Sequence, residues 1–83
     1  PVILDTLGWT YLVSGRLTLA QQTLSRALEL NGDLHSARLH LAMTYLAQND
    51  RASAYDELIH VRDADPQGDA GKFAVQLLQQ YFP

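Results

Sequence analysis

The chain has 83 residues, of which 47% are hydrophobic and 18% are charged, and its formal net charge is -3. This size and composition indicate one small folded domain and argue against disorder. The sequence has no cluster of Lys or Arg, which argues against nucleic-acid binding, and no run of about 18 apolar residues, which argues against a membrane span. It has no cysteine, so disulfides and thiolate chemistry are excluded.

The first two predicted helices form a pair. The first runs from about residue 3 to residue 13 and ends at Gly15, because glycine readily adopts the left-handed conformation that follows a helix C-terminus. Thr18 is the expected N-cap of the second helix, and Gln21 three residues later completes a capping-box pattern. The second helix is expected to end at the polar segment 31–33.

Three more helices are predicted after this break. Asp33 is the expected N-cap of the third, and Asn49 follows it as a residue that tolerates the left-handed region. Asp50 can cap a fourth helix, which ends before Pro66 because proline disfavours the helical conformation in the residue that precedes it. Asp69 is the expected cap of a fifth helix. No segment alternates apolar and polar residues, so no strand is expected.

The sequence also repeats itself at a fixed interval. Segment 7–11 reads LGWTY, and segment 41–45 reads LAMTY. Later matches at the same interval are Ala20 with Ala54, Leu24 with Leu58, and Ala27 with Val61. A fixed interval of this kind indicates stacked copies of one unit. Gly8 and Ala42 hold equivalent positions, where a small side chain allows two helices to approach closely.

These residues resemble the tetratricopeptide repeat family, whose helix-turn-helix signature contains Leu-Gly-x-x-Tyr followed by Ala, an aromatic residue, Ala and Pro, and recurs at the interval seen here. The opening aromatic residue of the signature is missing from both copies, and Gly32 replaces the first terminal proline. The resemblance implies an all-α fold, a right-handed α-solenoid of five helices in antiparallel pairs. The implied units are repeat 1 at 1–34, repeat 2 at 35–68, and a half repeat at 69–83 that caps the stack.

The last helix fits the repeat only after a shift of two residues. Without the shift, Gln76 and Gln79 would occupy core positions, which is unfavourable for polar side chains. With the shift, the core positions hold Ala74, Leu77, Leu78 and Tyr81. We therefore expect a lengthened loop around 66–69.

Arrays of fewer than about three repeats are usually marginally stable. We therefore expect the chain to be a fragment of a longer protein, or to pair through an end face where Val2, Ile3 and Leu4 lie uncovered. The chain starts at Pro1 and carries no signal peptide, so both cytoplasm and periplasm stay open. Many bacterial proteins with similar repeats belong to envelope assemblies, and by analogy a bacterial source is expected.

The resemblance implies a protein-protein interaction scaffold that holds a peptide or a helical segment in a concave groove. The groove residues would be Asp5, Trp9, Leu12, Leu39, His40, Met43, Leu46, Lys72, Val75 and Gln79. Apolar side chains of the partner would be buried along Trp9, Leu39, Met43 and Leu46, with Asp5, His40 and Lys72 at the rim. Trp9 is the most informative residue, because tryptophan is enriched at binding hot spots. The alternative is that Trp9 packs as ordinary core.

One version of the family grips a peptide carboxylate with a set of five cationic and amide side chains. The matching positions of this chain hold Asp5, Trp9, His40, Lys72 and Gln76, of which only Lys72 agrees. A carboxylate needs several convergent donors, and Asp5 would repel it. We therefore expect a more apolar ligand, such as an amphipathic helix.

The polar residues do not form a recognisable catalytic or metal site. His35 and His40 are five residues apart, whereas two zinc ligands on one helix need a spacing of four. Ser36 and His40 lie one helical turn apart, which is close enough for a nucleophile and its general base. The sequence shows no third group that would orient the base and no oxyanion hole. No catalytic residue, metal or cofactor is expected. Three alternatives remain: a structural or homodimerising segment without its own ligand, a nucleic-acid reader, and an enzyme.

Overall fold

The computed structural model describes residues 1–83 as five α-helices without a strand. The helices are α1 (Val2–Val13), α2 (Leu17–Leu30), α3 (His35–Ala47), α4 (Arg51–Ala64) and α5 (Asp69–Tyr81). The prediction of an all-α chain with five helices is confirmed.

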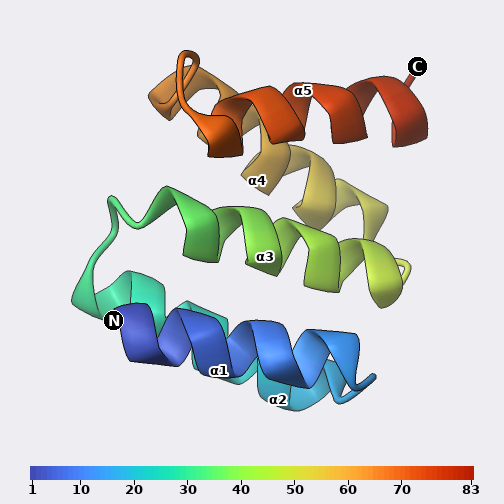
Figure 1. The fold of residues 1–83 in the computed structure, drawn as a ribbon. Helices are drawn as coiled ribbons and strands as arrows, with labels where there is room; N and C mark the ends of the chain where they lie inside the picture. Colours follow the sequence, from blue (N-terminus) through green and yellow to red (C-terminus); the bar gives the residue numbers. More distant parts are fainter.

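The helices form two layers. Figure 1 shows α1, α3 and α5 stacked one above another, with α2 and α4 behind them, and the contacts between helices agree with this order. The Cα trace measures 29 × 25 × 17 Å, and its shortest dimension fits two layers of helices whose axes lie about 8 to 10 Å apart. This is a stack of helical hairpins with one added helix. We call the layer of α1, α3 and α5 the inner layer.

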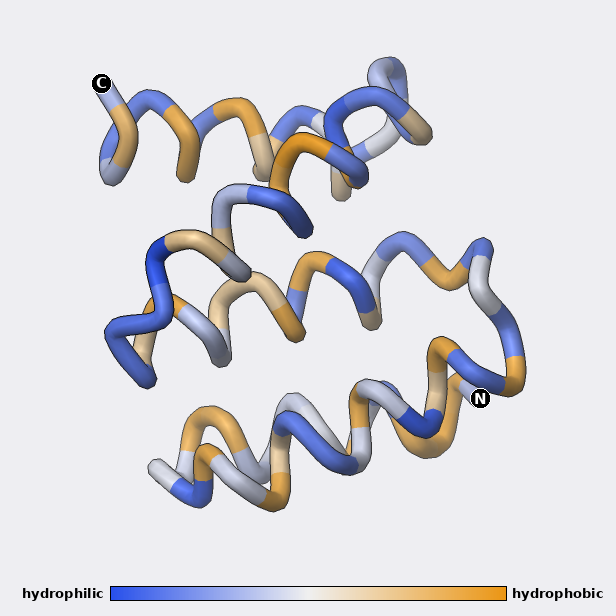
Figure 2. Tube along the Cα trace, turned by 180° about the vertical axis from the view of Figure 1, so that it is seen from behind, coloured by the Kyte–Doolittle hydropathy of each residue, from blue (hydrophilic) through white to orange (hydrophobic).

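The core consists of two clusters that follow each other along the stack. The first joins α2 to α3 and contains Leu24, Ala27, Ala37 and Leu41. The second joins α3, α4 and α5 and contains Leu39, Ala42, Leu58, Val61, Ala74 and Leu77. Figure 2 shows hydrophobic and hydrophilic segments alternating along the helices, as expected for amphipathic helices that each bury one face. Leu24 and Leu58, the same position of the two repeats, are both fully buried.

Close helix packing explains the glycine inside α1. Gly8 is buried, and a Cβ atom placed on it would lie 2.5 Å from two side-chain carbons of Leu24. Leu24 is itself fully buried, so an alanine at this position would force a shift within the core. The expectation that a small residue lets two helices approach closely at this position is confirmed.

The turns within the two hairpins match each other. Gly15 has a φ of 80° and Asn49 has a φ of 62°, so both residues adopt the left-handed conformation that was expected of them. Asp50 also acts as predicted, because its side chain accepts a hydrogen bond of 3.1 Å from the backbone N–H of Ser53 at the start of α4. This bond satisfies one of the free N–H groups of the first turn.

Three other predicted N-caps are wrong. α2 begins one residue before Thr18, and α5 begins at Asp69, so both of these residues lie inside the first turn. Asp33 lies before the cap position of α3, and its backbone N–H donates to the side chain of Asn31 at 3.0 Å. Asp69 still lies in the first turn, where a negative charge interacts favourably with the helix dipole.

The predicted lengthened loop before α5 is also wrong. The connections 31–34 and 65–68 have the same length, and α5 begins at the repeat position that corresponds to His35 at the start of α3. The expected burial is nevertheless found for Ala74 and Leu77, and Leu78 packs against the same cluster. Tyr81 is exposed, contrary to expectation. α5 is anchored by the apolar face that it directs at α3 and α4, which carries Ala74 and Leu77.

Candidate partner-binding surface

The ten predicted groove residues all lie on the inner layer, on α1, α3 and α5 (Figure 1). They differ in what they expose. Asp5 and Leu39 are buried, Trp9, Lys72 and Gln79 are exposed, and the remaining five are half-buried. The inner layer therefore contains structural and accessible side chains side by side.

Asp5 joins α1 to α3. Only 7% of this residue is exposed, and its two carboxylate oxygens have separate partners. One accepts a hydrogen bond of 2.6 Å from the Ser36 hydroxyl, and the other lies 2.7 Å from Nδ1 of His40. A buried carboxylate is costly unless it is paired, and these two bonds supply the pairing. Asp5 therefore links α1 to α3. The prediction that it lies at the groove rim, available to a partner, is wrong.

This cluster also defines what Ser36 and His40 can do. In a catalytic triad the nucleophile bonds to the base, and the acid orients the base from the far side. Here the carboxylate of Asp5 lies between the other two, and both the Ser36 hydroxyl and the His40 ring are directed at it. The arrangement positions His40 and does not prepare Ser36 for attack.

Trp9 is neither sealed in the core nor free. Its exposed fraction is 37%, and its ring packs against the ring of His40 with a centroid distance of 4.7 Å and an interplanar angle of 35°. Because Asp5 fixes His40, the indole rests on a rigid support. One face of the only tryptophan is thus held by the protein while part of the ring stays accessible to a partner.

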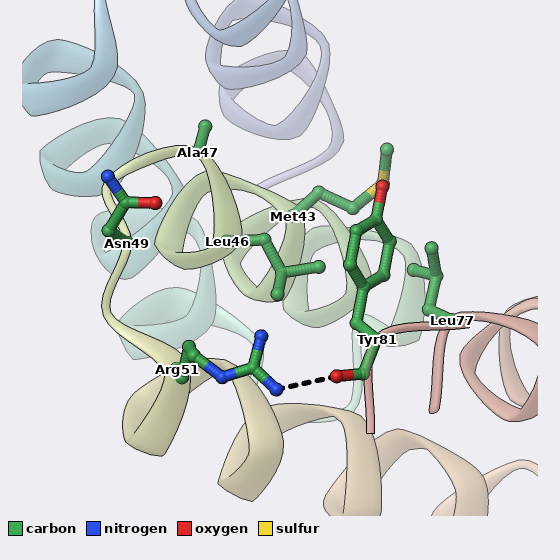
Figure 3. Close-up of a pocket in the computed structure, with 7 residues that line it drawn as sticks. All are labelled: Met43, Leu46, Ala47, Asn49, Arg51, Leu77 and Tyr81. Carbon is green, nitrogen blue, oxygen red and sulfur yellow. Dashed lines mark hydrogen bonds between the residues drawn. The ribbon is translucent and has the colours of Figure 1, made fainter. Parts of the chain in front are cut away.

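A pocket of about 440 Å³ opens between the C-terminal halves of α3 and α5. It is lined by Met43, Leu46, Ala47, Asn49, Arg51, Leu77 and Tyr81, and Figure 3 shows these side chains around it. Most of the lining is apolar. Met43 and Leu46 were predicted from the sequence, whereas the other five residues were not.

Arg51 closes one side of the pocket. Its guanidinium donates a hydrogen bond of 2.6 Å to the backbone carbonyl of Tyr81, drawn as a dashed line in Figure 3, and lies 4.6 Å from the ring centroid of Phe82. The start of α4 is thereby tied to the end of α5. No pattern in the sequence joins residues 30 positions apart on different helices, so this side of the pocket could not be predicted.

Leu39 corrects a second groove assignment. It is 8% exposed and belongs to the core cluster with Ala74 and Leu77, because α5 covers it. The repeat pattern placed Leu39 on the groove side of α3. That side is covered wherever the next inner helix packs, so Leu39 stabilises the stack and offers no accessible surface.

Two further observations concern the whole chain. None of the five helices has the length and apolar character needed to cross a membrane. The structure contains no group of three or more His, Cys, Asp or Glu side chains that could hold a metal ion.

Comparison with protein families gives one match. A family model described as Tetratricopeptide repeat matches residues 11–80, which is most of the chain. Comparisons with curated proteins and with solved structures give no match.

Proposed function

The chain belongs to the tetratricopeptide repeat family, whose repeats generally mediate protein-protein interaction, and we propose that it binds an amphipathic partner segment along the inner layer. In this proposal one large apolar side chain of the partner enters the pocket between α3 and α5, and a second apolar side chain packs on Trp9. The pocket is the observation that carries the proposal.

The size and lining of the pocket support an apolar anchor. A volume of about 440 Å³ lies within the range of about 300 to 1,000 Å³ that is usual for ligand pockets. Met43 and Leu46 are half-buried, so they present apolar surface without being fixed in the core. Methionine adapts its shape to different side chains, which suits a site for a Leu, Met or Phe residue of a partner.

The charges around the pocket support an acidic residue in the partner next to its apolar anchor. Arg51 uses one N–H group for the carbonyl of Tyr81, and a guanidinium has five N–H donors in total. It is the only charged residue in the pocket lining. A carboxylate placed beside the anchor could pair with the Arg51 guanidinium at the pocket edge through a charge-assisted hydrogen bond.

Trp9 supports a second contact at the other end of the inner layer. Its ring already rests on His40, which is held by Asp5, so little conformational entropy would be lost when a partner packs on the exposed part. Rigid aromatic side chains of this kind dominate many interfaces. Two anchors on one layer suit an extended or helical segment better than a small molecule.

Peptide display tests the proposal. A random peptide library is selected on the immobilised chain, and the affinity of one selected peptide is measured for the wild type, Leu46→Glu, Trp9→Ala and the control Leu19→Glu, which places the same charge on exposed α2. We expect Leu46→Glu and Trp9→Ala to weaken binding by roughly tenfold or more, because each removes an apolar anchor. The control should bind like the wild type. Equal binding by all four proteins would contradict the proposal.

We also propose that the hairpins correspond to repeats 1–34 and 35–68 and that 69–83 acts as a capping half repeat. The cap is supported by what α5 covers: Leu58 and Val61 of α4 and Ala42 of α3 are fully buried in a cluster that Ala74 and Leu77 complete. Without α5, this apolar surface would meet water.

A further inference from the structure

Trp9 and His40 place two ring nitrogens without a partner next to each other on the inner layer. The centroids of the two rings lie 4.7 Å apart. None of the side-chain hydrogen bonds of the protein involves the indole N–H of Trp9 or Nε2 of His40. Both residues lie where α1 and α3 meet, so these two helices form the whole site.

Asp5 decides which nitrogen of His40 carries the hydrogen. Nδ1 of His40 lies 2.7 Å from one carboxylate oxygen of Asp5, and the other oxygen accepts from the Ser36 hydroxyl. A carboxylate offers only acceptors, so Nδ1 must hold the hydrogen and donate it, and Nε2 of the neutral ring is then an acceptor. Among the residues that are not exposed, only Arg38 has a buried side-chain nitrogen or oxygen without a partner, so Nε2 of His40 is accessible.

The indole N–H of Trp9 supplies a donor next to this acceptor. Indole nitrogen can only donate, and a buried indole N–H usually has a partner within the protein. The exposed fraction of Trp9 is 37%, so a partner molecule can engage its N–H without breaking a bond of the protein. The Trp9 ring packs on His40, which Asp5 holds in turn, so the donor and the acceptor keep their relative positions.

We propose that Trp9 and His40 together bind the side-chain carboxamide of an Asn or Gln residue in the partner. Its C=O accepts from the indole of Trp9, and its NH₂ group donates to Nε2 of His40. A carboxamide suits this pair because it carries its acceptor and its donor on two branches of one small group. The proposal rests on the proposed function, since it adds a polar contact beside the apolar side chain that packs on Trp9.

Other polar groups of a partner fit this pair less well. A carboxylate has no donor for Nε2 of His40 and would approach the charge of Asp5. An ammonium or guanidinium group can stack on the indole but has no acceptor for its N–H. Backbone amides offer both, but within a helical partner they are already paired with each other. A carboxamide side chain can reach both nitrogens from a helical or an extended segment.

NMR of the chain with ¹⁵N-labelled histidine rings tests the acceptor before any partner is present. The variant His40→Asn identifies the signals of His40, and His35 and His60 are the internal references. We expect Nδ1 of His40 to be protonated and Nε2 to be unprotonated at mildly alkaline pH. We also expect the Nε2 resonance to shift when a display-selected peptide binds. A ring of His40 that carries hydrogen on Nε2 in the free chain would overturn the proposal.

Peptides selected on the immobilised chain give the second test. We expect Asn or Gln to be enriched at one position, and replacing Gln there by the similarly shaped Met should weaken binding roughly tenfold, through the loss of two neutral hydrogen bonds. Trp9→Phe keeps an aromatic ring without the N–H, and His40→Asn keeps a donor for Asp5 without Nε2. Both variants should bind the Gln and Met peptides with nearly equal affinity, as a double-mutant cycle requires.

Leu46→Glu separates this proposal from the proposed function. It should weaken the binding of both peptides and leave the ratio of their affinities unchanged, because Leu46 lines the pocket. Equal affinities of the wild type for both peptides, with binding still weakened by Leu46→Glu, would overturn the carboxamide site alone. Enrichment of Lys or Arg at that position would overturn it in favour of a cation stacked on Trp9. A library that yields no binder would contradict the proposed function and this proposal together.

Discussion

Replacing Asp5 by alanine should destabilise the fold measurably, although the residue lies outside both apolar clusters. The substitution removes the acceptor of two hydrogen bonds, of 2.6 Å from Ser36 and 2.7 Å from His40. Ser36 and His40 are both half-buried, so the Ser36 hydroxyl and Nδ1 of His40 would each lose their hydrogen-bond partner in a place that water reaches only in part. The helices α1 and α3 lose the polar link between the two hairpins.

The expected loss follows from the environment of the carboxylate. Hydrogen bonds to a charged group contribute about 1.5 to 3 kcal/mol each, and the Asp5 side chain is only 10% exposed, so solvent screens them little. Alanine recovers up to about 0.7 kcal/mol through its higher helix propensity, and water can reach the exposed part of His40. We expect a net loss of about 2 kcal/mol, which in a domain of this size lowers Tm by roughly 8 to 16 °C.

Urea unfolding followed by tryptophan fluorescence measures this loss. Trp9 is the only tryptophan and packs on His40 at 4.7 Å, so its emission should also change in the folded state of Asp5→Ala. Ser36→Ala removes one of the two bonds and should cost about half as much. An unfolding midpoint for Asp5→Ala at or above that of the wild type would refute the reasoning that this cluster joins the hairpins.

Three further substitutions test other contacts, each against a matched control. Gly71→Ala should lower the free energy of unfolding by about 1 to 3 kcal/mol, because the added Cβ would overlap the backbone carbonyl of Asp65. The control Gly32→Ala should be neutral or slightly stabilising in the same urea titration, because the atom nearest to its Cβ would lie 3.8 Å away. Asp50→Ala should lower the free energy of unfolding by about 1 kcal/mol, because the backbone N–H of Ser53 at the start of α4 loses its acceptor. Asp33 caps no helix, so Asp33→Ala should lower this free energy by less. Equal losses from the two substitutions would argue against the cap at Asp50. Burial, followed by the negative charges of Glu57 and Asp50, raises the pKa of Tyr45 above its ordinary value of 10.0. The unfolded chain therefore releases this proton first, and stability should fall as pH rises past about 10; Tyr45→Phe should flatten that decline in urea midpoints, whereas an unchanged slope would contradict it.

Features that depend on the local chain were predictable from the sequence. Gly15 and Asn49 mark left-handed turns because few other residues adopt that conformation, and Gly8 marks a close helix contact because nothing else explains a glycine inside α1. The fixed repeat interval then assigned the helical pairs. The N-caps were less predictable, since Thr18, Asp33 and Asp69 each lie within two residues of a cap and only the backbone geometry decides among neighbours.

Features that depend on two helices coming together were missed. The resemblance to the repeat family implied that Asp5 lies at the groove rim, but α3 brings Ser36 and His40 to it from 31 and 35 residues away. Arg51 and Tyr81 meet at the pocket for the same reason. Leu39 was assigned to the groove from its helix face, which α5 covers. A surface position was predictable only where no neighbouring helix packed over it.

The affinity of one display-selected peptide for the wild type and for Leu46→Glu tests the proposed binding surface most directly. Leu46 lines the pocket from α3 without belonging to either core cluster, so a charge there should alter the surface and leave the stack intact. We predict binding weakened by roughly tenfold or more with unchanged circular dichroism and an unchanged urea midpoint. Equal affinities, with Leu19→Glu also equal, would contradict the pocket as a binding site.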